Sequence, residues 1–159
     1  MTIKDVLKKL KAVPTQKVYG TNGRLEIPDI GIGVPLYEAG NGNAQKIVDN
    51  INSAAFIRFG EQGIIADHVC QGFSNLINVK PGMTEAYIRY ADGRQKAYTC
   101  QCSQLGHIRK SASGNSLLDW TWNRALGNNK ASLVIYTCLG NPKGTEQSVT
   151  LTYWTENVQ

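Results

Sequence analysis

The chain has 159 residues, of which 42% are hydrophobic and 18% are charged. This length and composition fit one globular domain with a single core and leave no room for a second folded unit. No apolar run approaches the roughly 20 residues of a membrane-spanning helix, and no leader pattern follows Met1. The sequence therefore predicts a single domain without stable membrane insertion.

The formal net charge is +5, but the lysines and arginines are scattered along the chain, apart from a cluster of Lys8, Lys9 and Lys11. A nucleic-acid surface needs clustered basic residues interleaved with aromatic side chains. We therefore expect an ordinary solubilising surface and no nucleic-acid partner.

Residues 1–14 have the pattern of a short amphipathic helix. Apolar side chains recur at positions 3, 6, 7, 10 and 13, while Thr2 can cap the helix and Pro14 ends it. Packing over the domain's own core is the favoured use of this stripe, with a membrane or a partner as alternatives. Residues 15–159 are then expected to form the domain itself.

Most of the remaining chain consists of short runs that predict β-strands. The expected strands are 24–30, 32–37, 63–66, 84–91, 95–102, 131–137 and 148–153, and residues 103–110 are expected to prolong the sheet. Asp92-Gly93, between two of these runs, is a strong hairpin signal. Two further helices are expected, over 43–56 and 117–126. This pattern predicts a mainly β domain, closed as a barrel or packed as a sandwich, with a few short helices.

Four cysteines stand at positions 70, 100, 102 and 138, in a spacing that does not suggest a disulfide framework. Cys100 and Cys102 are two apart on an expected strand, so both thiols should point to one face. With Cys70 and His107 they would complete a Cys3His zinc site, although neither half has the usual C-x2-C spacing. The favoured interpretation is that these cysteines pack as small hydrophobic residues, with no metal and no cofactor.

Two residues with catalytic potential end predicted strands. Cys138 closes the run 131–138, and His68 closes the run 63–68. Taken alone, each is more often an ordinary packing residue than a catalyst. Adjacent strand ends of a closed barrel can nevertheless hold such a pair at one rim, which predicts a Cys/His nucleophilic site.

Three stretches, in the same order along the chain, resemble the sortases, a family of bacterial cysteine transpeptidases. Residues 27–37 resemble the family's early strand pair, I-P-x-I-x-x-x-x-P-I-Y. Residues 64–68, followed by 73–76 and 80–82, resemble its I-x-G-H…F-x-x-L…K-x-G-D region, and residues 134–138 are similar to T-L-x-T-C. The resemblance covers residues 23–153 and implies a closed eight-stranded barrel.

The resemblance also implies a mechanism. Cys138 would attack a substrate carbonyl to form a thioacyl enzyme, and His68, as imidazolium, would protonate the leaving amine. An acceptor amine or water would then resolve the intermediate. Thr137 would position the strand end.

The chain departs from the family pattern in two places near this site. The family has an arginine at the start of the final strand, whereas residues 145–150 contain none, and Gln147 is the best-placed residue. A neutral amide would weaken transition-state stabilisation by a factor on the order of a hundred. Lys143, Arg109 and Arg124 are candidate substitutes for oxyanion or substrate binding.

The second departure is Asp67, which replaces the small residue usual before the histidine. It either attracts the imidazolium or points away, as strand neighbours do.

We therefore expect a sortase-like cysteine transpeptidase or peptidase that cleaves a short sorting signal, by resemblance of the LPxTG type. The alternative is a catalytically weakened sortase-fold binding or assembly module of phage or mobile-element type. The expected location is cytoplasmic or phage-associated, unless a leader was removed.

Overall fold

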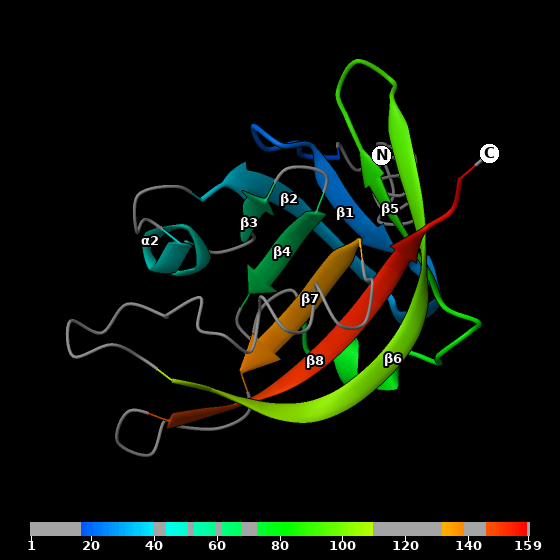
Figure 1. Cartoon of the computed structure of the whole chain (residues 1–159). Coiled ribbons are helices and arrows are strands. Elements are labelled where there is room, and N and C mark those ends of the chain that lie inside the picture. Colours follow the sequence, from blue (N-terminus) through cyan, green and yellow to red (C-terminus); the bar gives the residue numbers. More distant parts are fainter. Residues whose placement is uncertain are drawn as a thin grey trace, which may run out of the picture.

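The computed structural model describes residues 17–39, 44–50, 53–59, 62–67, 73–109, 132–138 and 146–158. Within these ranges, eight strands close into a barrel in the order β1-β2-β3-β4-β7-β8-β6-β5 (Figure 1). The strands are β1 (Arg24–Ile27), β2 (Ile32–Glu38), β3 (Ala54–Phe59), β4 (Gln62–Asp67), β5 (Glu85–Arg89), β6 (Gln95–Arg109), β7 (Leu133–Cys138) and β8 (Glu146–Glu156). The helical elements are α2 (Ala44–Val48) and the 3-10 turns η1 (Pro28–Ile30) and η2 (Leu76–Asn78). The predicted mainly β, closed eight-stranded barrel is confirmed.

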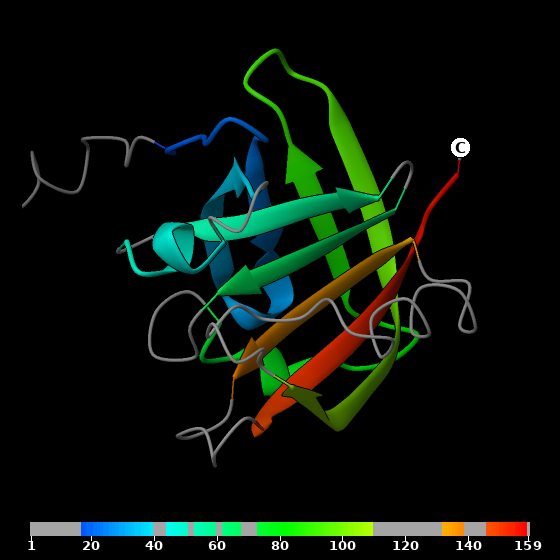
Figure 2. The same cartoon turned by 60° about the vertical axis from the view of Figure 1, so that its left-hand side comes forward.

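Two parallel strand pairs set the shape of the barrel. β1/β2, β3/β4 and β5/β6 are antiparallel neighbours, and β1 pairs with β5 to close the sheet. The parallel pairs are β2/β3 and β4/β7. Since parallel strands end at the same edge of a sheet, the carboxyl ends of β4 and β7 lie side by side (Figure 2).

All eight strands contribute alternate side chains to the barrel interior. This core includes Leu25 and Leu36, Ile65 and Ile135, and Trp154, each 0% exposed. Phe73 and Leu76, which come from the segment around η2, are also buried in it. Successive residues of a strand therefore alternate between the interior and the outer face.

The hairpin predicted at Asp92-Gly93 is confirmed. Gly93 has a φ of 93°, in the left-handed region that glycine adopts most easily. The Tyr90 N–H donates to the Arg94 carbonyl over 2.9 Å, and the Asp92 carboxylate accepts the Arg94 N–H over 3.0 Å. This turn joins β5 to β6 in the register that the sequence indicates.

The helix predicted over 43–56 is wrong in its second half. α2 ends at Val48, and β3 begins at Ala54. Ala54 and Phe56 face the core, while Ala55 packs against α2 on the outer face. The apolar spacing of this segment fits either structure, and pairing with β2 and β4 selects the strand.

Other predicted boundaries shift or cannot be compared. The run 24–30 divides into β1 and η1, where Pro28 starts the 3-10 turn and Gly31 ends it with a φ of 69°. β8 is longer than the predicted run 148–153. The helices predicted over 1–14 and 117–126 lie outside the described residues. Within those residues, no helix has the length and apolarity to cross a bilayer.

An ionic cluster ties β1 to β5 on the outer face of the barrel. Glu26 is only 8% exposed and lies 3.0 Å from Lys17, 3.3 Å from Arg24 and 2.7 Å from Arg89. Desolvation alone would raise the pKa of Glu26, but hydrogen bonds and charge from Lys17 and Arg89 outweigh it and lower the pKa below its ordinary 4.5.

We predict that Glu26→Gln destabilises the protein at neutral pH and flattens its acid unfolding. The free energy of unfolding should fall by about 2 kcal/mol, because Lys17, Arg24 and Arg89 would lose the carboxylate that they share. The loss is not larger, because solvent screens the charge of the exposed Lys17. A carboxylate whose pKa is lowered by folding contributes stability above pH 4.5, and this contribution is lost as the pH falls through the folded pKa. Urea unfolding between pH 3 and 7 (roughly the range set by the linkage) measures both effects.

The matched control is Glu85→Gln, which changes an exposed carboxylate on β5 that accepts a hydrogen bond from the Tyr87 hydroxyl. Its stability should stay within about 0.5 kcal/mol of the parent at every pH. Equal acid profiles for Glu26→Gln and the parent would contradict the assignment of this stability to Glu26.

Candidate active site

The parallel pairing of β4 and β7 positions the candidate site. Asp67, the last residue of β4, is the register partner of Thr137. The Thr137 hydroxyl donates to the Asp67 carbonyl oxygen over 2.8 Å, and both residues are buried. We call this contact the strand-end hydrogen bond. It fixes the last residues of β4 and β7 against each other, directly before Cys138 on β7 and at the residue that precedes His68 in the sequence.

Cys138 ends β7 on the outer face of the barrel. Its side chain is partly exposed and packs against an apolar group that we call the outer cluster. The outer cluster consists of Ile64, Ala66, Val134, Tyr136, Val149, Leu151 and Tyr153. Thr137, one residue earlier, faces the interior, as alternation along a strand requires. The thiol therefore lies at the partly exposed end of a buried apolar group on the outer side of β4, β7 and β8.

The other predicted site residues are described only in part. Gln147 lies in β8, two residues before Val149, and Val149 is the register partner of Cys138. The backbone of Arg109 ends β6 opposite Glu146. The side chains of Gln147 and Arg109 are not described. His68, Lys143 and Arg124 lie outside the described residues, so the approach of a base or a cation to the thiol stays a prediction.

Buried polar groups line the interior below the strand ends. Asp67 is 4% exposed, and Thr150, the register partner of Thr137, is 2% exposed. Among the residues that the structure describes, none forms a hydrogen bond with the Thr150 hydroxyl oxygen. The sequence analysis did not single out Thr150, because a threonine in a run such as Thr150-Leu151-Thr152 looks solvent-facing, whereas both faces of β8 are buried here.

A β-bulge separates Cys100 from Cys102. The register of β6 against β8 shifts between them, so that Cys100 pairs with Trp154 and Cys102 pairs with Tyr153. Cys100 is consequently in the core, whereas Cys102 packs against the outer cluster. The expectation that both thiols point to one face is wrong, because the extra residue of a bulge reverses the alternation. This geometry disfavours a zinc site that uses both.

Burial raises the pKa of the Cys100 thiol to about 11. At neutral pH this thiol stays protonated and is a poor nucleophile. Cys138, which is partly exposed at a strand end, is better placed for chemistry than Cys100.

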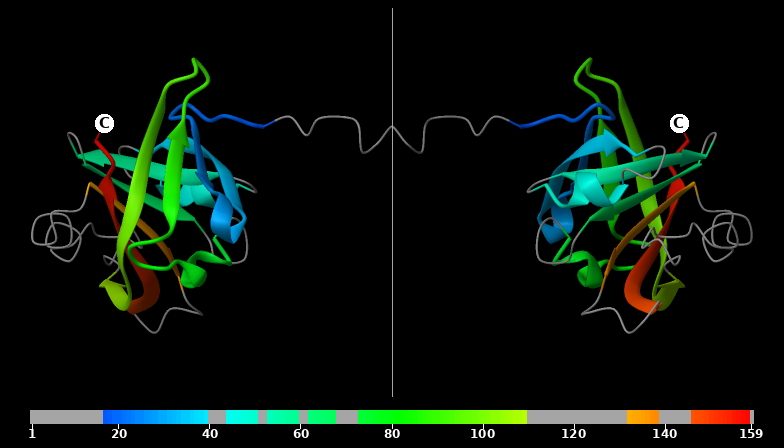
Figure 3. Two further views of the ribbon diagram at one scale, coloured as in Figure 1. Left: turned by 90° about the vertical axis from the view of Figure 1, so that its right-hand side faces the viewer. Right: turned by 90° about the vertical axis from the view of Figure 1, so that its left-hand side faces the viewer.

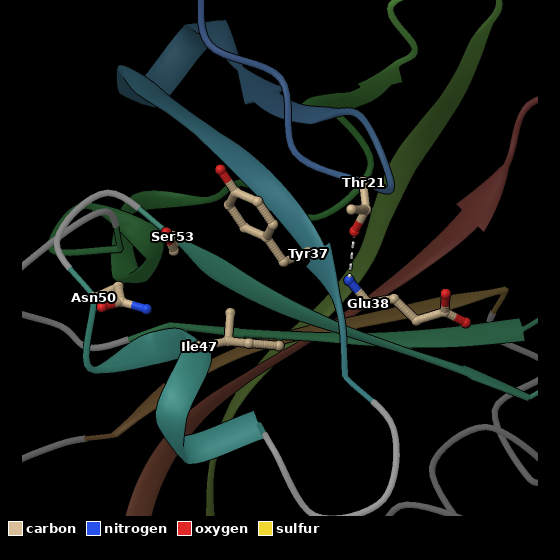
Figure 4. A pocket seen from close by; sticks show the side chains of 6 residues that line it. All are labelled: Thr21, Tyr37, Glu38, Ile47, Asn50 and Ser53. Atoms are coloured by element: carbon tan, nitrogen blue, oxygen red, sulfur yellow. Dashed lines mark hydrogen bonds between the residues drawn. The ribbon is translucent and has the colours of Figure 1, made fainter.

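A cavity of about 460 Å³ opens on the other side of β4 from Cys138 (Figure 4). It is lined by Thr21, Tyr37, Glu38, Ile47, Asn50 and Ser53. Ala66 pairs with both Ala55 and Tyr136, and Ser53 and Cys138 are each two residues further toward the same end. The cavity wall at Ser53 is therefore level with Cys138, two strands away.

The cavity could not be predicted from the sequence, because its residues come from a turn, the end of β2, α2 and the start of β3. No periodic pattern connects these segments. Figure 4 shows Ile47 and Tyr37 at its centre and the Glu38 side chain extending away from Asn50.

No family model matches the chain, and no curated protein matches it in sequence. The fold does match solved structures. Sortase C1 of Streptococcus agalactiae matches with a TM-score of 0.53 and 17% identity, over 99% of this chain and 79% of that one. A lid mutant of sortase A from Corynebacterium diphtheriae matches with a TM-score of 0.53 and 13% identity, over 98% and 80%.

A third structure, sortase C of Clostridium perfringens with the C-terminal cell wall sorting motif, has a TM-score of 0.52 and 15% identity, over 84% of this chain and 70% of that one. At such identities the likeness establishes the fold alone. The chain has a divergent sortase-like barrel, as the motifs of the sequence predicted.

Proposed function

We propose that the protein is a sortase-like cysteine transpeptidase or peptidase acting on a short peptide signal. The observation that carries the proposal is the parallel, hydrogen-bonded pairing of the ends of β4 and β7, with Cys138 partly exposed directly after it. Because two strand ends are held in this way, we expect the residues that follow them to lie at one rim of the barrel. The residue after Asp67 is His68, which supplies the acid and base function.

The reaction proceeds in two steps, acylation of Cys138 and transfer of the acyl group. The Cys138 thiolate attacks the carbonyl carbon of a peptide bond, and the C–N bond breaks as His68 delivers a proton to the leaving amine. The resulting thioester is then attacked by an amine, which gives a new peptide bond, or by water, which gives a carboxylic acid. Either attack returns the thiol.

The charge that develops on the carbonyl oxygen needs donors near β8. Gln147 offers a neutral amide, and Lys143, Arg124 and Arg109 are cationic candidates from neighbouring segments. A neutral amide alone supports slower catalysis than a guanidinium in the same place.

The substrate is a sorting-type peptide segment, in line with the sorting motif named for the Clostridium perfringens structure. Cys138 is the partly exposed end of the otherwise buried outer cluster, so the peptide would reach the thiol at the end of β7. The cavity at Ser53, level with the thiol, is the proposed place for the amine acceptor. Its described lining residues include one carboxylate and no cationic side chain, which suits an amine better than an acid.

The test uses a set of sorting-signal peptides, including Leu-Pro-Ala-Thr-Gly, and intact-mass detection of a thioacyl adduct. The adduct should form on the parent protein, disappear in Cys138→Ala and persist in Cys102→Ala, the matched control on the same outer face. Added triglycine should convert the acyl group into a peptide product. No adduct with any peptide would count against catalysis.

A second candidate function rests on residues 145–150, which contain no arginine. A sortase-fold module with weakened chemistry would bind its partner without turnover. Its signature is a Cys138 thiol that a maleimide probe alkylates no faster than it alkylates free cysteine, together with a stable complex. Fast alkylation at mildly acidic pH would contradict it, because only an activated thiolate reacts there.

A further inference from the structure

β6 extends beyond the strand that covers one of its edges. It pairs with β5 only from Gln95, opposite Arg89, to Thr99, opposite Glu85. With β8 it pairs from Tyr98 to Arg109. The last backbone contacts on the β5 side are made by Cys100, with Gly82 and Thr84. We call residues 103–109 the β6 overhang. β6 runs from the β5–β6 hairpin to the far end of the barrel (Figure 3).

The direction of the backbone groups in the β6 overhang follows from the register. The Trp154 carbonyl accepts a hydrogen bond from Ser132, so Trp154 directs its backbone toward β7. Alternation then directs Thr152 and Thr150 toward β7, and Leu151 and Val149 toward β6. On β6, the register partners of Leu151 and Val149 direct their backbone groups toward β8, and the partners of Thr152 and Thr150 direct theirs away from it. Gln104 and Gly106 bond to β8, whereas Ser103 and Leu105 present N–H and C=O to the open edge.

Within the described part of the chain, this edge lacks the usual protection of edge strands. Among the described residues, no backbone group pairs with Ser103 or Leu105 on the open side. Residues 103–106 include no charge and no proline, and Leu105 is 73% exposed. Exposed edges are normally blunted by charge, proline or a covering segment, because they are templates for another strand.

The open edge is aligned with the candidate nucleophile. Leu105 pairs with Thr150 and Thr150 with Thr137, while Gly106 pairs with Val149 and Val149 with Cys138. At about 4.8 Å between strands, β6 lies about 10 Å from β7, and a strand added to its open edge would lie about 14 Å from β7. An extended chain covers that distance with about five residues.

We propose that the β6 overhang binds an extended segment of the polypeptide substrate by β-strand addition, outside the signal that is cleaved. This inference rests on the proposed function and names how the substrate is held. Unpaired backbone groups recognise an extended chain largely independently of its sequence, and Leu105 adds an apolar contact. A second copy of the chain is a poorer occupant, because stable dimers bury about 1,200 Å² or more and this edge is short.

The test compares peptides that carry Leu-Pro-Ala-Thr-Gly with or without a flank of alternating threonine and valine. The flank is joined through a five-residue Gly/Ser spacer to either end of the signal. At subsaturating peptide, the flank on one end should raise the rate of thioacyl formation about tenfold by raising the local concentration of the signal. N-methylation of alternate flank residues, which removes backbone donors, should abolish the gain.

Leu105→Pro tests the protein side. Proline removes one N–H that points to the open edge and none that bonds to β8, so the barrel should fold and process the unflanked peptide as before. The gain from the flank should disappear in Leu105→Pro and persist in Leu105→Ala, the matched control that keeps the backbone donor. Anisotropy of the labelled flanked peptide on Cys138→Ala, with and without Leu105→Pro, reports the same contact without catalysis.

The outcomes separate the two proposals. Absence of any adduct, with flank-dependent binding to Cys138→Ala retained, would contradict the proposed function and support the edge contact. Equal rates for flanked and N-methylated peptides on the parent protein would overturn the edge contact. Light scattering that shows a dimer which Leu105→Pro converts to a monomer would also overturn it, because the edge would then be occupied by a second copy.

Discussion

Trp154→Ala is expected to lower the free energy of unfolding by about 4 kcal/mol. Trp154 is 0% exposed and lies in the core to which all eight strands contribute. Its indole N–H donates to the Thr152 hydroxyl over 2.7 Å, and that hydroxyl donates to the Ile135 carbonyl over 2.6 Å. Alanine would leave a cavity in a barrel that closes around it and remove one donor from this chain of hydrogen bonds.

The matched control is Trp154→Phe, which keeps an aromatic ring but removes the indole N–H. It should cost about 1–2 kcal/mol, the sum of a smaller packing loss and one hydrogen bond. Urea unfolding followed by far-ultraviolet circular dichroism measures both variants. A loss below about 1 kcal/mol for Trp154→Ala would contradict the assignment of this residue to the barrel core.

Thr137→Val is expected to reduce the rate of thioacyl formation on the order of a hundredfold, while lowering stability by only about 1 kcal/mol. Valine has the shape of threonine but cannot donate to the Asp67 carbonyl. Without the strand-end hydrogen bond, the ends of β4 and β7 are no longer held in register directly before the two proposed catalytic residues. Small displacements there separate sulfur from imidazole and slow the reaction.

Thr152→Val separates positioning from stability. Thr152 makes a comparable buried hydrogen bond between β8 and β7, but it bonds to Ile135, three residues before the nucleophile. This control should lose at least as much stability as Thr137→Val and keep the parent rate. Equal rate losses in the two variants would indicate general destabilisation and contradict a positioning role for Thr137.

The strand pattern of this chain could be predicted because short β-type runs between turn signals are local features of the sequence. The runs around Ile65 and Ile135 are short and continuously apolar, as in strands with both faces buried, and the structure places their alternate residues in the core and in the outer cluster. The Asp92-Gly93 turn is equally local. Closure of the barrel followed from the resemblance to a family, because no local pattern distinguishes a closed sheet from a sandwich.

The failures have a different physical cause, which is that pairing partners are distant in sequence. β3 looks helical until β2 and β4 are known to flank it, since its apolar residues satisfy both periods. The bulge in β6 is invisible in the sequence, because Cys100-Gln101-Cys102 alternates normally and only the register of β8 reveals the extra residue.

In the candidate site, too, local motifs could be predicted and contacts between distant segments could not. The sequence predicted Cys138 at the end of one strand and His68 at the carboxyl end of another, over 63–66, and the structure pairs these two strands as β7 and β4. The strand-end hydrogen bond, the buried Thr150 and the cavity at Ser53 depend on contacts between distant segments, which spacing along the chain does not encode. The positions of His68, Lys143 and Arg124 stay predictions.

The most direct measurement is to map the acyl group after reaction with a sorting-signal peptide, by digestion and tandem mass spectrometry of the trapped enzyme. The proposed chemistry predicts a thioester on Cys138, with Cys100 and Cys102 unmodified. An acyl group on another cysteine, or complete turnover by Cys138→Ala, would contradict it.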